Sequence, residues 1–533
     1  MRIGHLHWVA ALGVALIASS ASPPDAAAGG PPHTRSAWVR RAPVRKAPRV
    51  RPRARPRRVV GRLPSPAAAE RFMSDVIARE RRFYQPGVAY DGETGLTFDG
   101  HPIEQRSGQL RGTPRNWSAA SKESLHIILL VKALTGDATA RALITPDPAD
   151  PDAAVGRALH VLGRKIATYR RFHERHPGFA GFLPWFKVER GELVPMKGWT
   201  DRVPGLDNGQ LAWSLYLAEG ALRETGHIEL ADAYREHLEL MADNVVRVFY
   251  DPAGQHFRGE AKIGRGAGVA PGRNRYRNGG YLIKDAYEGL LLIHFADLMG
   301  RWPRRASGRD AVWRDARRVP ATYRAGDRDV TVVRGHWFSS HEDWGFLVLP
   351  FRDLPVADRL FQNGQRVRTQ HSAGRGWSGL FASTHRPIAG DSDQLAYENA
   401  AGIQEVAVDT VRAGDPIFAP YAAFPLAMVD RPLFAGWMKS MVERPGMLGP
   451  YGIGESYGED GTSAPLLTWD GKALPMIAWM GGVSADIGRQ LRRDGRYDAF
   501  MKRVRDDYRL FDPRTITGED VPFHAPPPAR QIR

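Results

Sequence analysis

Apolar residues recur at intervals of three and four along most of the chain beyond residue 66. In the segment 118–135 they fall at Leu125, Ile128, Leu129, Val131 and Leu134, a spacing that keeps one face of a helix apolar. The same spacing predicts helices over residues 67–84, 118–135, 152–171, 207–225, 228–249, 285–298, 354–361, 433–442 and 484–502.

Long loops rich in glycine, tryptophan and polar residues separate these helices. Two short apolar stretches, 330–334 and 346–349, predict strands and a small β insertion. About a dozen helical stretches with functional loops at their ends favour an all-α fold, an (α/α)6 toroid or barrel closed by a ring of helix pairs. A helical solenoid is the alternative, although the sequence shows no fixed repeat period.

The N-terminal residues have the pattern of a secretory signal peptide. A basic start at Arg2 is followed by an apolar stretch from Trp8 to Ala18 and by small residues at 19–21. The apolar stretch is too short to span a bilayer comfortably, so an uncleaved anchor is the lesser alternative. We predict a signal peptide over residues 1–27 and an exported protein, periplasmic or extracellular.

Residues 28–64 are rich in proline, arginine and alanine, which predicts a disordered linker. Residues 31–64 hold twelve Arg and Lys and no acid, and removing them from the net charge of +17 leaves +5. This basic tail suits contact with an anionic envelope surface, or it is simply a solvated linker. We assign residues 65–515 to one catalytic domain and residues 516–533 to a C-terminal tail.

The chain has 533 residues and no cysteine, so its stability depends on core size rather than on disulfides. The sequence contains no recognisable nucleic-acid module, phosphate loop or dinucleotide fingerprint, which argues against nucleic-acid or nucleotide partners. We expect a monomer that needs no cofactor.

Glycine- and aromatic-rich segments carry the candidate chemistry. The first, 199–211, contains Trp199, Asp201, Arg202 and Asp207. Asp207 opens a predicted helix, so its role could be merely structural, as the N-cap of that helix. Asp201 has no such structural explanation.

The second segment, 278–289, places Glu288 in the first turn of a predicted helix. Glu288 could simply complement the helix dipole, but apolar neighbours could also keep it protonated, as a general acid requires.

A third segment, 336–345, contains Trp337 and His341 among acidic residues. Because no His-Glu-x-x-His pattern or thiolate accompanies them, we favour sugar contacts and predict no metal. A fourth segment, 376–384, contains Trp377 and lacks the Gly-x-Ser-x-Gly pattern of a serine nucleophile.

The most informative segment is 449–461, which packs five glycines, two tyrosines and three acids into one irregular stretch and is followed by Trp469 and Asp470. Glycines allow sharp turns and close approach to a ligand. Glu455 and Tyr457 lie within it, so it combines the aromatic faces and carboxylates that a sugar-binding cleft needs.

Five motifs occur in an order that resembles the glucoamylase-like glycoside hydrolases, a family that includes endo-β-1,2-glucanases and a domain of cyclic β-1,2-glucan synthases. Each motif is weak alone, and together they cover roughly residues 200–485. The matching stretches are Asp207-Asn208-Gly209-Gln210-Leu211, Tyr287-Glu288, Trp377-Ser378-Gly379-Leu380-Phe381-Ala382-Ser383, Ile417-Phe418-Ala419-Pro420-Tyr421-Ala422-Ala423 and Tyr451-Gly452-Ile453-Gly454-Glu455-Ser456-Tyr457.

The resemblance implies an (α/α)6 barrel with a sugar cleft at one end, Glu288 as general acid and β-1,2-glucan as the expected substrate. Hydrolysis needs a second carboxylate, for which we select Asp207, with Asp201 as the alternative. Inverting hydrolysis and retaining transglycosylation both stay open. Glu455 replaces an aspartate common in the family, and Ser378 is inserted in the tryptophan turn, so a divergent branch with a different glycan is also open.

The remaining aromatic and polar candidates are assigned to substrate binding. We expect stacking on sugar rings from Trp199, Trp337, Trp377 and Tyr457. We expect hydrogen bonds to sugar hydroxyl groups from Arg202, His341, Glu455 and Asp470.

Two other functions compete with hydrolysis. A polysaccharide lyase on the same fold would use His341, Tyr281 and the arginine-rich loop 264–277 on a uronate, and its unsaturated products would absorb ultraviolet light. A non-catalytic envelope glycan-binding protein would bind sugar without turnover.

Overall fold

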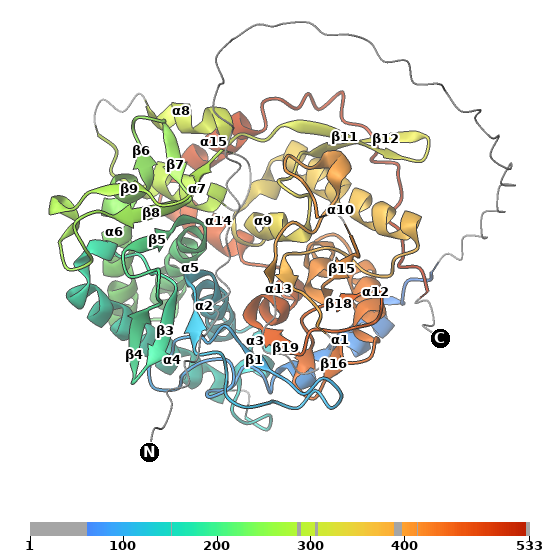
Figure 1. The fold of residues 1–533 in the computed structure, drawn as a ribbon, viewed down its shortest axis with the longest axis horizontal. Coiled ribbons are helices and arrows are strands. Elements are labelled where there is room, and N and C mark those ends of the chain that lie inside the picture. The colour runs from blue at the N-terminus through green and yellow to red at the C-terminus, as the bar shows by residue number, and fades with distance from the viewer. Residues whose placement is uncertain are drawn as a thin grey trace, which may run out of the picture.

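The computed structural model describes residues 61–528, except residues 151 and 413 and the segments 285–288, 304–307 and 389–396 (Figure 1). The predicted signal peptide, nearly all of the basic linker and Glu288 therefore lie outside the described residues. Within them, no helix is both long and apolar enough to cross a bilayer.

The described part of the chain is mostly helical. Its α-helices are α1 (Pro66–Glu80), α2 (Ala120–Leu134), α3 (Ala138–Ile144), α4 (Ala153–Arg175), α5 (Gly205–Glu224), α6 (Ile228–Phe249), α7 (Gly289–Met299), α8 (Gly308–Asp315), α9 (Trp344–Val348), α10 (Pro355–Arg375), α11 (Phe424–Ala427), α12 (Arg431–Val442), α13 (Trp469–Trp479), α14 (Ser484–Arg493) and α15 (Tyr497–Asp507).

The strands are short and form small antiparallel sheets of two or three strands, none of which closes into a barrel among the described residues. They are β1 (Gly100–Pro102), β2 (Trp117–Ser118), β3 (Phe186–Glu189), β4 (Glu192–Pro195), β5 (Arg202–Pro204), β6 (Tyr250–Asp251), β7 (His256–Arg258), β8 (Glu260–Ile263), β9 (Tyr276–Asn278), β10 (Leu282–Ile283), β11 (Pro320–Ala325), β12 (Arg328–Val333), β13 (Thr384–His385), β14 (Tyr397–Glu398), β15 (Ile417–Phe418), β16 (Leu448–Gly449), β17 (Gly452–Ile453), β18 (Tyr457–Gly458) and β19 (Leu466–Thr468).

The helices pack in an inner and an outer layer. Helix α2 packs against α5 on one side and α13 on the other, α5 also contacts α7, and α13 contacts α11. Helices α4 and α6 cover α2 and α5 (Figure 1). Helix α12 packs against α11. Nearly every side chain of α2, α5 and α13 is buried, whereas α4 and α6 each bury one apolar face.

Two glycines allow the start of α5 to pack closely, Gly209 against α7 and Gly205 against β7. A Cβ atom on Gly209 would lie 2.6 Å from the backbone nitrogen of Leu292, and one on Gly205 would lie 2.9 Å from the carbonyl oxygen of Arg258. Both contacts are too short for any side chain, so only glycine permits this packing. The first turns of α5 and α7 are thereby held side by side.

The structure corrects several sequence-based element predictions. The strand expected over 346–349 is wrong, because these residues lie in and just after α9. The helix expected over 484–502 is two helices, α14 and α15, separated at Gly495, whose φ of 64° ends the first. Helix α13 was not predicted, since Pro475 lies inside it and its start reads as a loop. The strand expected over 330–334 is confirmed as part of β12.

The residues that the sequence separates as a C-terminal tail pack onto the helices as far as residue 528. Ile516 and Val521 are buried. The indole nitrogen of Trp437 in α12 donates to the carbonyl of His524 at 2.8 Å, and Thr331 in β12 donates its backbone N–H to the carbonyl of Thr517 at 3.1 Å. This segment is therefore part of the folded unit.

A fully buried ion pair joins α1 and α13 beneath the loop that leads to Glu455. Lys472 Nζ lies 3.2 Å from Glu80 Oε1 and donates to the carbonyl of Tyr451 at 2.6 Å. Glu80 also accepts the backbone N–H of Ile453 at 2.7 Å. Burial, offset only in part by Lys472, raises the pKa of Glu80 to about 7.

Replacing Lys472 by methionine is expected to lower the free energy of unfolding by about 3–5 kcal/mol at pH 8, because it leaves the Glu80 carboxylate buried without a cation. The loss should shrink at pH 5. A buried acid whose pKa is raised in the folded state is protonated at low pH and costs little stability there. As the pH rises, the unfolded state loses this proton before the folded state does, so the fold becomes progressively less stable. Urea unfolding at both pH values measures the effect. Lys439→Met is the control, because Lys439 and Glu443 form an exposed surface pair, and equal losses at the two pH values would contradict the prediction.

Candidate active site

Pairing between β1 and β19 brings two acidic residues together from opposite ends of the folded chain. Gly100 pairs with Thr468 in this antiparallel ladder, so Asp99 and Asp470 both lie at the same end of the sheet. The backbone N–H of Trp469 donates to the carbonyl of Asp99 at 3.3 Å. Thr468 caps α13 by accepting the N–H of Gly471, which places Asp470 in the first turn of that helix.

Lys122, in the first turn of α2, lies among these carboxylates. Its Nζ atom is 3.2 Å from Asp470 Oδ2, and each of the two side chains is only 12% exposed. Burial alone would lower the pKa of Lys122, but the negative charges of Asp470, Asp99 and Asp207 outweigh burial and raise it. The ammonium group is therefore charged throughout the pH range in which proteins are stable.

Asp99 is the most deeply buried acid of the group. Burial raises its pKa, and the nearby cations Lys122, His385 and Arg115 only partly oppose this. Arg115 Nη1 lies 3.4 Å from Asp99 Oδ2 and 3.3 Å from His385 Nε2.

Asp470 differs from its neighbours in having one carboxylate oxygen without a hydrogen-bond partner in the described part of the chain. Oδ2 faces Lys122, whereas Oδ1 is shielded from bulk water and accepts no hydrogen bond. A buried carboxylate oxygen left unpaired is costly, and such exceptions occur at functional sites. The oxygen is available to a water molecule or a substrate hydroxyl group.

Three tryptophans stack beside the acidic group. The rings of Trp117 and Trp185 are nearly parallel with centroids 5.7 Å apart, and those of Trp185 and Trp199 likewise at 5.5 Å. Trp185 donates its indole N–H to Asp207 Oδ2 at 3.0 Å. Asp207 therefore lies within α5, in its first turn, and accepts this indole rather than capping the helix. The N-cap position belongs to Pro204.

Glu455 is held beside Asp470 by a hydrogen-bond network. It accepts from Thr384 at 2.9 Å and from Thr468 at 2.5 Å, and His385 Nδ1 lies 3.3 Å from Oε1. Burial alone would raise the pKa of Glu455, but the hydrogen bonds and charge of His385 and the two threonines outweigh burial and lower it. A buried glutamate kept ionised in this way presents a fixed negative charge.

Tyr397 in β14 was not singled out by the sequence, because it is an isolated aromatic in a loop. Its ring is 42% exposed and packs edge-on against His385 with centroids 5.4 Å apart. Its phenol also contributes to the charge environment of Lys122. Trp117 and Trp185 were missed for the same reason, since no local pattern distinguishes them from core tryptophans.

Asp201 and Arg202 lie at the start of β5, in the sheet that leads into α5. Lys262 Nζ is 3.6 Å from Asp201 Oδ2, and Arg202 Nη1 is 2.5 Å from Glu260 Oε1. Both residues are half-buried and tied to β8. No contact between them and Asp99, Lys122 or Asp470 is found among the described residues.

Trp337 and His341 occupy a separate turn before α9. The Glu342 carboxylate accepts the backbone N–H groups of Trp337 and Phe338 at 2.6 and 2.7 Å. His341 packs edge-on against the buried Trp344 with centroids 5.6 Å apart. The contacts described in the structure do not join these two residues to the acidic group.

Trp377 and Tyr457 pack around Phe418, with ring centroids 5.8 and 5.4 Å away. Tyr457 is only 1% exposed, donates to the carbonyl of Ser378 at 3.4 Å and lies under Arg444. Tyr457 is therefore part of the protein interior, whereas Trp377 is partly buried against it.

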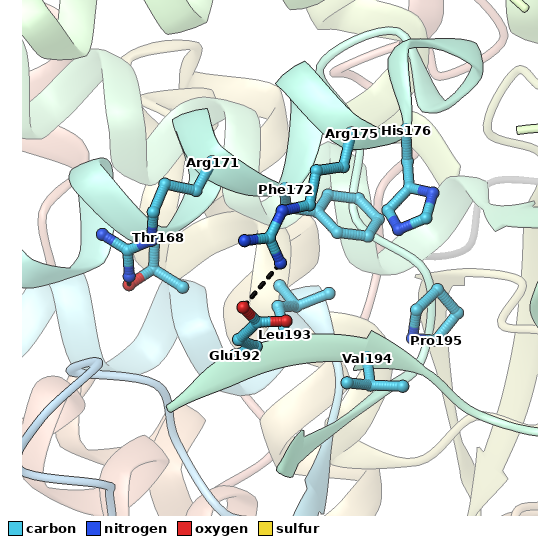
Figure 2. A pocket seen from close by; sticks show the side chains of 9 residues that line it. All are labelled: Thr168, Arg171, Phe172, Arg175, His176, Glu192, Leu193, Val194 and Pro195. Carbon is cyan, nitrogen blue, oxygen red and sulfur yellow. Dashed lines mark hydrogen bonds and ion pairs between the residues drawn. The ribbon is translucent and has the colours of Figure 1, made fainter. Parts of the chain in front are cut away.

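A surface cavity of about 80 Å³ lies between α4 and β4, in a different place from the acidic group (Figure 2). Figure 2 shows Arg171, Arg175 and His176 on one side and Glu192 on the other. Arg175 and Glu192 form an ion pair at 2.6 Å and are about half exposed. This ion pair joins α4 to β4, so we interpret it as an anchor of the β3–β4 hairpin on α4. No group of three or more potential metal ligands occurs among the residues that the structure describes.

Comparisons with known proteins identify the family. The sequence model of the endo-β-1,2-glucanase SGL family matches residues 96–531. None of the curated proteins with which the sequence was compared matches it. An endo-β-1,2-glucanase from Talaromyces funiculosus, solved with sophorose, is 32% identical over 86% of this chain and 93% of that chain, with a TM-score of 0.82.

Two further solved structures complete the comparison. A glutamate-to-glutamine mutant of the Talaromyces enzyme with β-1,2-glucan matches with the same TM-score of 0.82, 32% identity and coverage of 86% and 93%. An endo-β-1,2-glucanase from Chitinophaga pinensis, in a complex with sophorotriose and glucose, shares the fold at 12% identity, a TM-score of 0.54 and coverage of 82% and 98%. The resemblance inferred from the sequence is confirmed: the chain belongs to the endo-β-1,2-glucanase SGL family, glycoside hydrolase family 162, and is a glycoside hydrolase.

Proposed function

We propose that this protein hydrolyses internal linkages of β-1,2-glucan by acid–base catalysis with two carboxylates. The observation that carries the proposal is the group of Asp99, Asp207 and Asp470 around Lys122, with one free oxygen on Asp470. The stacked tryptophans beside it offer aromatic surface to sugar rings. The relatives solved with sophorose and β-1,2-glucan support this choice of substrate.

The packing of the inner helices favours an (α/α)6 toroid as the frame of this site. Helices α7, α5, α2, α13 and α11 contact one another in that order. We propose that α9 closes the ring, since it contacts the turn Ser340–Asp343, which in turn contacts α11. The first turns of α2, α5 and α13 then point their acidic and basic residues toward one end of the ring.

Glu288 is the proposed proton donor, as the family resemblance implies. It immediately precedes Gly289, the first residue of α7. Contacts of Gly205 and Gly209 with Leu292 hold α7 against the first turns of α5, where Asp207 lies. The proposal for Glu288 therefore rests on the order of the sequence motifs and on the place of Gly289 at the start of α7.

For the second carboxylate, which accepts a proton from attacking water, the sequence selected Asp207. The geometry favours Asp470 instead. Asp207 Oδ2 already accepts the indole N–H of Trp185. Asp470 Oδ1 has no partner, and its other oxygen is paired with a cation. A carboxylate with a free oxygen and a fixed orientation is suited to accept a proton from attacking water. Asp201 remains the more distant alternative.

We also propose that the protein is exported by its N-terminal signal peptide and acts on glucan outside the cytoplasm. The basic segment that follows would then touch anionic envelope surface. Both proposals rest on the sequence pattern of residues 1–64.

The proposed function is tested by incubating the purified protein with linear β-1,2-, β-1,3- and β-1,4-glucans, arabinan and a uronate polysaccharide. We expect β-1,2-linked oligosaccharides from the first substrate alone. The polymer size should fall before glucose accumulates, because cleavage is internal. Unsaturated products from the uronate would indicate a lyase instead, and binding without any product would indicate a glycan-binding protein.

A further inference from the structure

We propose that Lys122 is a positioning residue that fixes the Asp470 carboxylate and directs its free oxygen toward the substrate. This inference rests on the proposed function, because it assigns Asp470 to the water side of the reaction. It concerns a residue in the first turn of α2, outside every motif that the sequence indicated.

The first step in the argument is the geometry of the ion pair. Lys122 Nζ contacts Oδ2 of Asp470 at 3.2 Å and leaves Oδ1 without a partner. An ammonium group on one oxygen limits rotation of the carboxylate and keeps the second oxygen in one direction. A proton acceptor must be fixed in this way for efficient transfer.

The second step is the set of charges that face Lys122. Asp470 comes from α13, Asp99 from the segment before β1, Asp207 from α5 and the Tyr397 phenol from β14. Three carboxylates so close together repel one another, and such repulsion favours protonation of one of them. Lys122 is the cation in contact with Asp470 among the described residues, so it opposes that protonation directly.

Two further groups lie behind Asp99. Arg115 lies 3.4 Å from Asp99 Oδ2 and 3.3 Å from His385 Nε2. His385 is in turn 3.3 Å from Glu455. Arg115 therefore gives Asp99 a second cation besides Lys122, whereas Lys122 is the cation in contact with Asp470 among the described residues.

Buried ion pairs elsewhere in the fold show how a positioning role for Lys122 differs from a purely stabilising one. Lys165 and Glu123 are 2.6 Å apart, both are fully buried, and both oxygens of Glu123 accept hydrogen bonds. The Lys122–Asp470 pair is partly open and leaves a carboxylate oxygen available. The structural pair Lys472–Glu80 also leaves one oxygen, Glu80 Oε2, without a partner, but both of its side chains are fully buried. Partial exposure of the pair together with a free oxygen is therefore what distinguishes Lys122 and Asp470 from these two structural pairs.

The experiment measures the pH dependence of kcat/KM on linear β-1,2-glucan for the wild type, Lys122→Met and Lys122→Arg. Loss of the adjacent cation removes the contact that favours the carboxylate form of Asp470, so the acidic limb of the Lys122→Met profile should move up by at least about one pH unit. Activity should recover toward high pH, where Asp470 is ionised again. Lys122→Arg should keep the limb near its wild-type position.

Lys132→Met is the matched control, because Lys132 lies on the same helix and pairs with Asp486 at 3.7 Å, away from the acidic group. Its acidic limb should not move. An unmoved limb in Lys122→Met, or activity that is lost at every pH without recovery, would overturn the inference.

A wild type that does not cleave β-1,2-glucan would contradict the proposed function and not this inference. Unfolding measurements then decide the matter. With Lys122 replaced by methionine, the buried Asp470 carboxylate has lost its adjacent cation, so stability should fall more steeply with rising pH than in Lys132→Met. Parallel stability profiles for the two variants would overturn the inference.

Discussion

Glu288→Gln is expected to reduce hydrolysis of linear β-1,2-glucan by about 10²–10⁴-fold, the usual contribution of a general acid. Glutamine has nearly the same shape but cannot donate the proton that the leaving sugar oxygen needs. Release of reducing ends measures the rate. Binding of β-1,2-linked oligosaccharides, followed by calorimetry, should persist, because the shape of the site is retained.

A substrate with a better leaving group sharpens this test. A nitrophenyl group leaves with little need for protonation, so Glu288→Gln should lose much less activity on a nitrophenyl glycoside of a β-1,2-linked oligosaccharide. Glu236→Gln is the control, since Glu236 is an exposed residue paired with Arg170 on the outer helices. Full activity of Glu288→Gln on the polymer would show that another group donates the proton.

Asp470→Asn is expected to lower kcat by about 10²–10⁴-fold with little change in KM, because asparagine cannot accept a proton from attacking water. Asp207→Asn should have a smaller effect, since Asp207 Oδ2 is occupied by the indole N–H of Trp185. Measuring both variants on the same substrate compares the two candidates directly. A larger loss in Asp207→Asn would restore Asp207 as the water-side carboxylate.

The anomeric form of the first product adds independent information on these carboxylates. Proton NMR of the fresh wild-type reaction reports whether the product is inverted or retained. Inversion means that one carboxylate activates water directly, whereas retention requires a covalent intermediate. In the retaining case, the variant of the nucleophile should fail to form that intermediate with a slowly hydrolysed fluoride substrate.

Much of the helical framework could be predicted from local sequence. The helix expected over 228–249 has the observed bounds of α6, because its apolar residues lie on one face and the other face is exposed. Among the inner helices, α2 and α5 were predicted close to their observed bounds, whereas α13 was not. Helix α13 is buried all round and contains Pro475, so neither periodicity nor propensity marked it.

The sequence by itself determined the family, the export signal pattern and the segments that carry aromatic and acidic residues, since these depend on local composition and motif order. It included Asp207, Glu455 and Asp470 among the candidates. It assigned Asp470 to substrate binding, because a residue's partners are not visible in the local sequence.

Only the tertiary structure decided which candidates lie close together. The β1–β19 pairing joins Asp99 to Asp470, and helix packing brings Lys122 and Asp207 from α2 and α5 to the same place. The three stacked tryptophans come from separate segments in the same way. Such groups form through contacts between residues far apart in the chain, and burial then sets their charge states. Neither the contact nor the burial is encoded in the spacing of neighbouring residues.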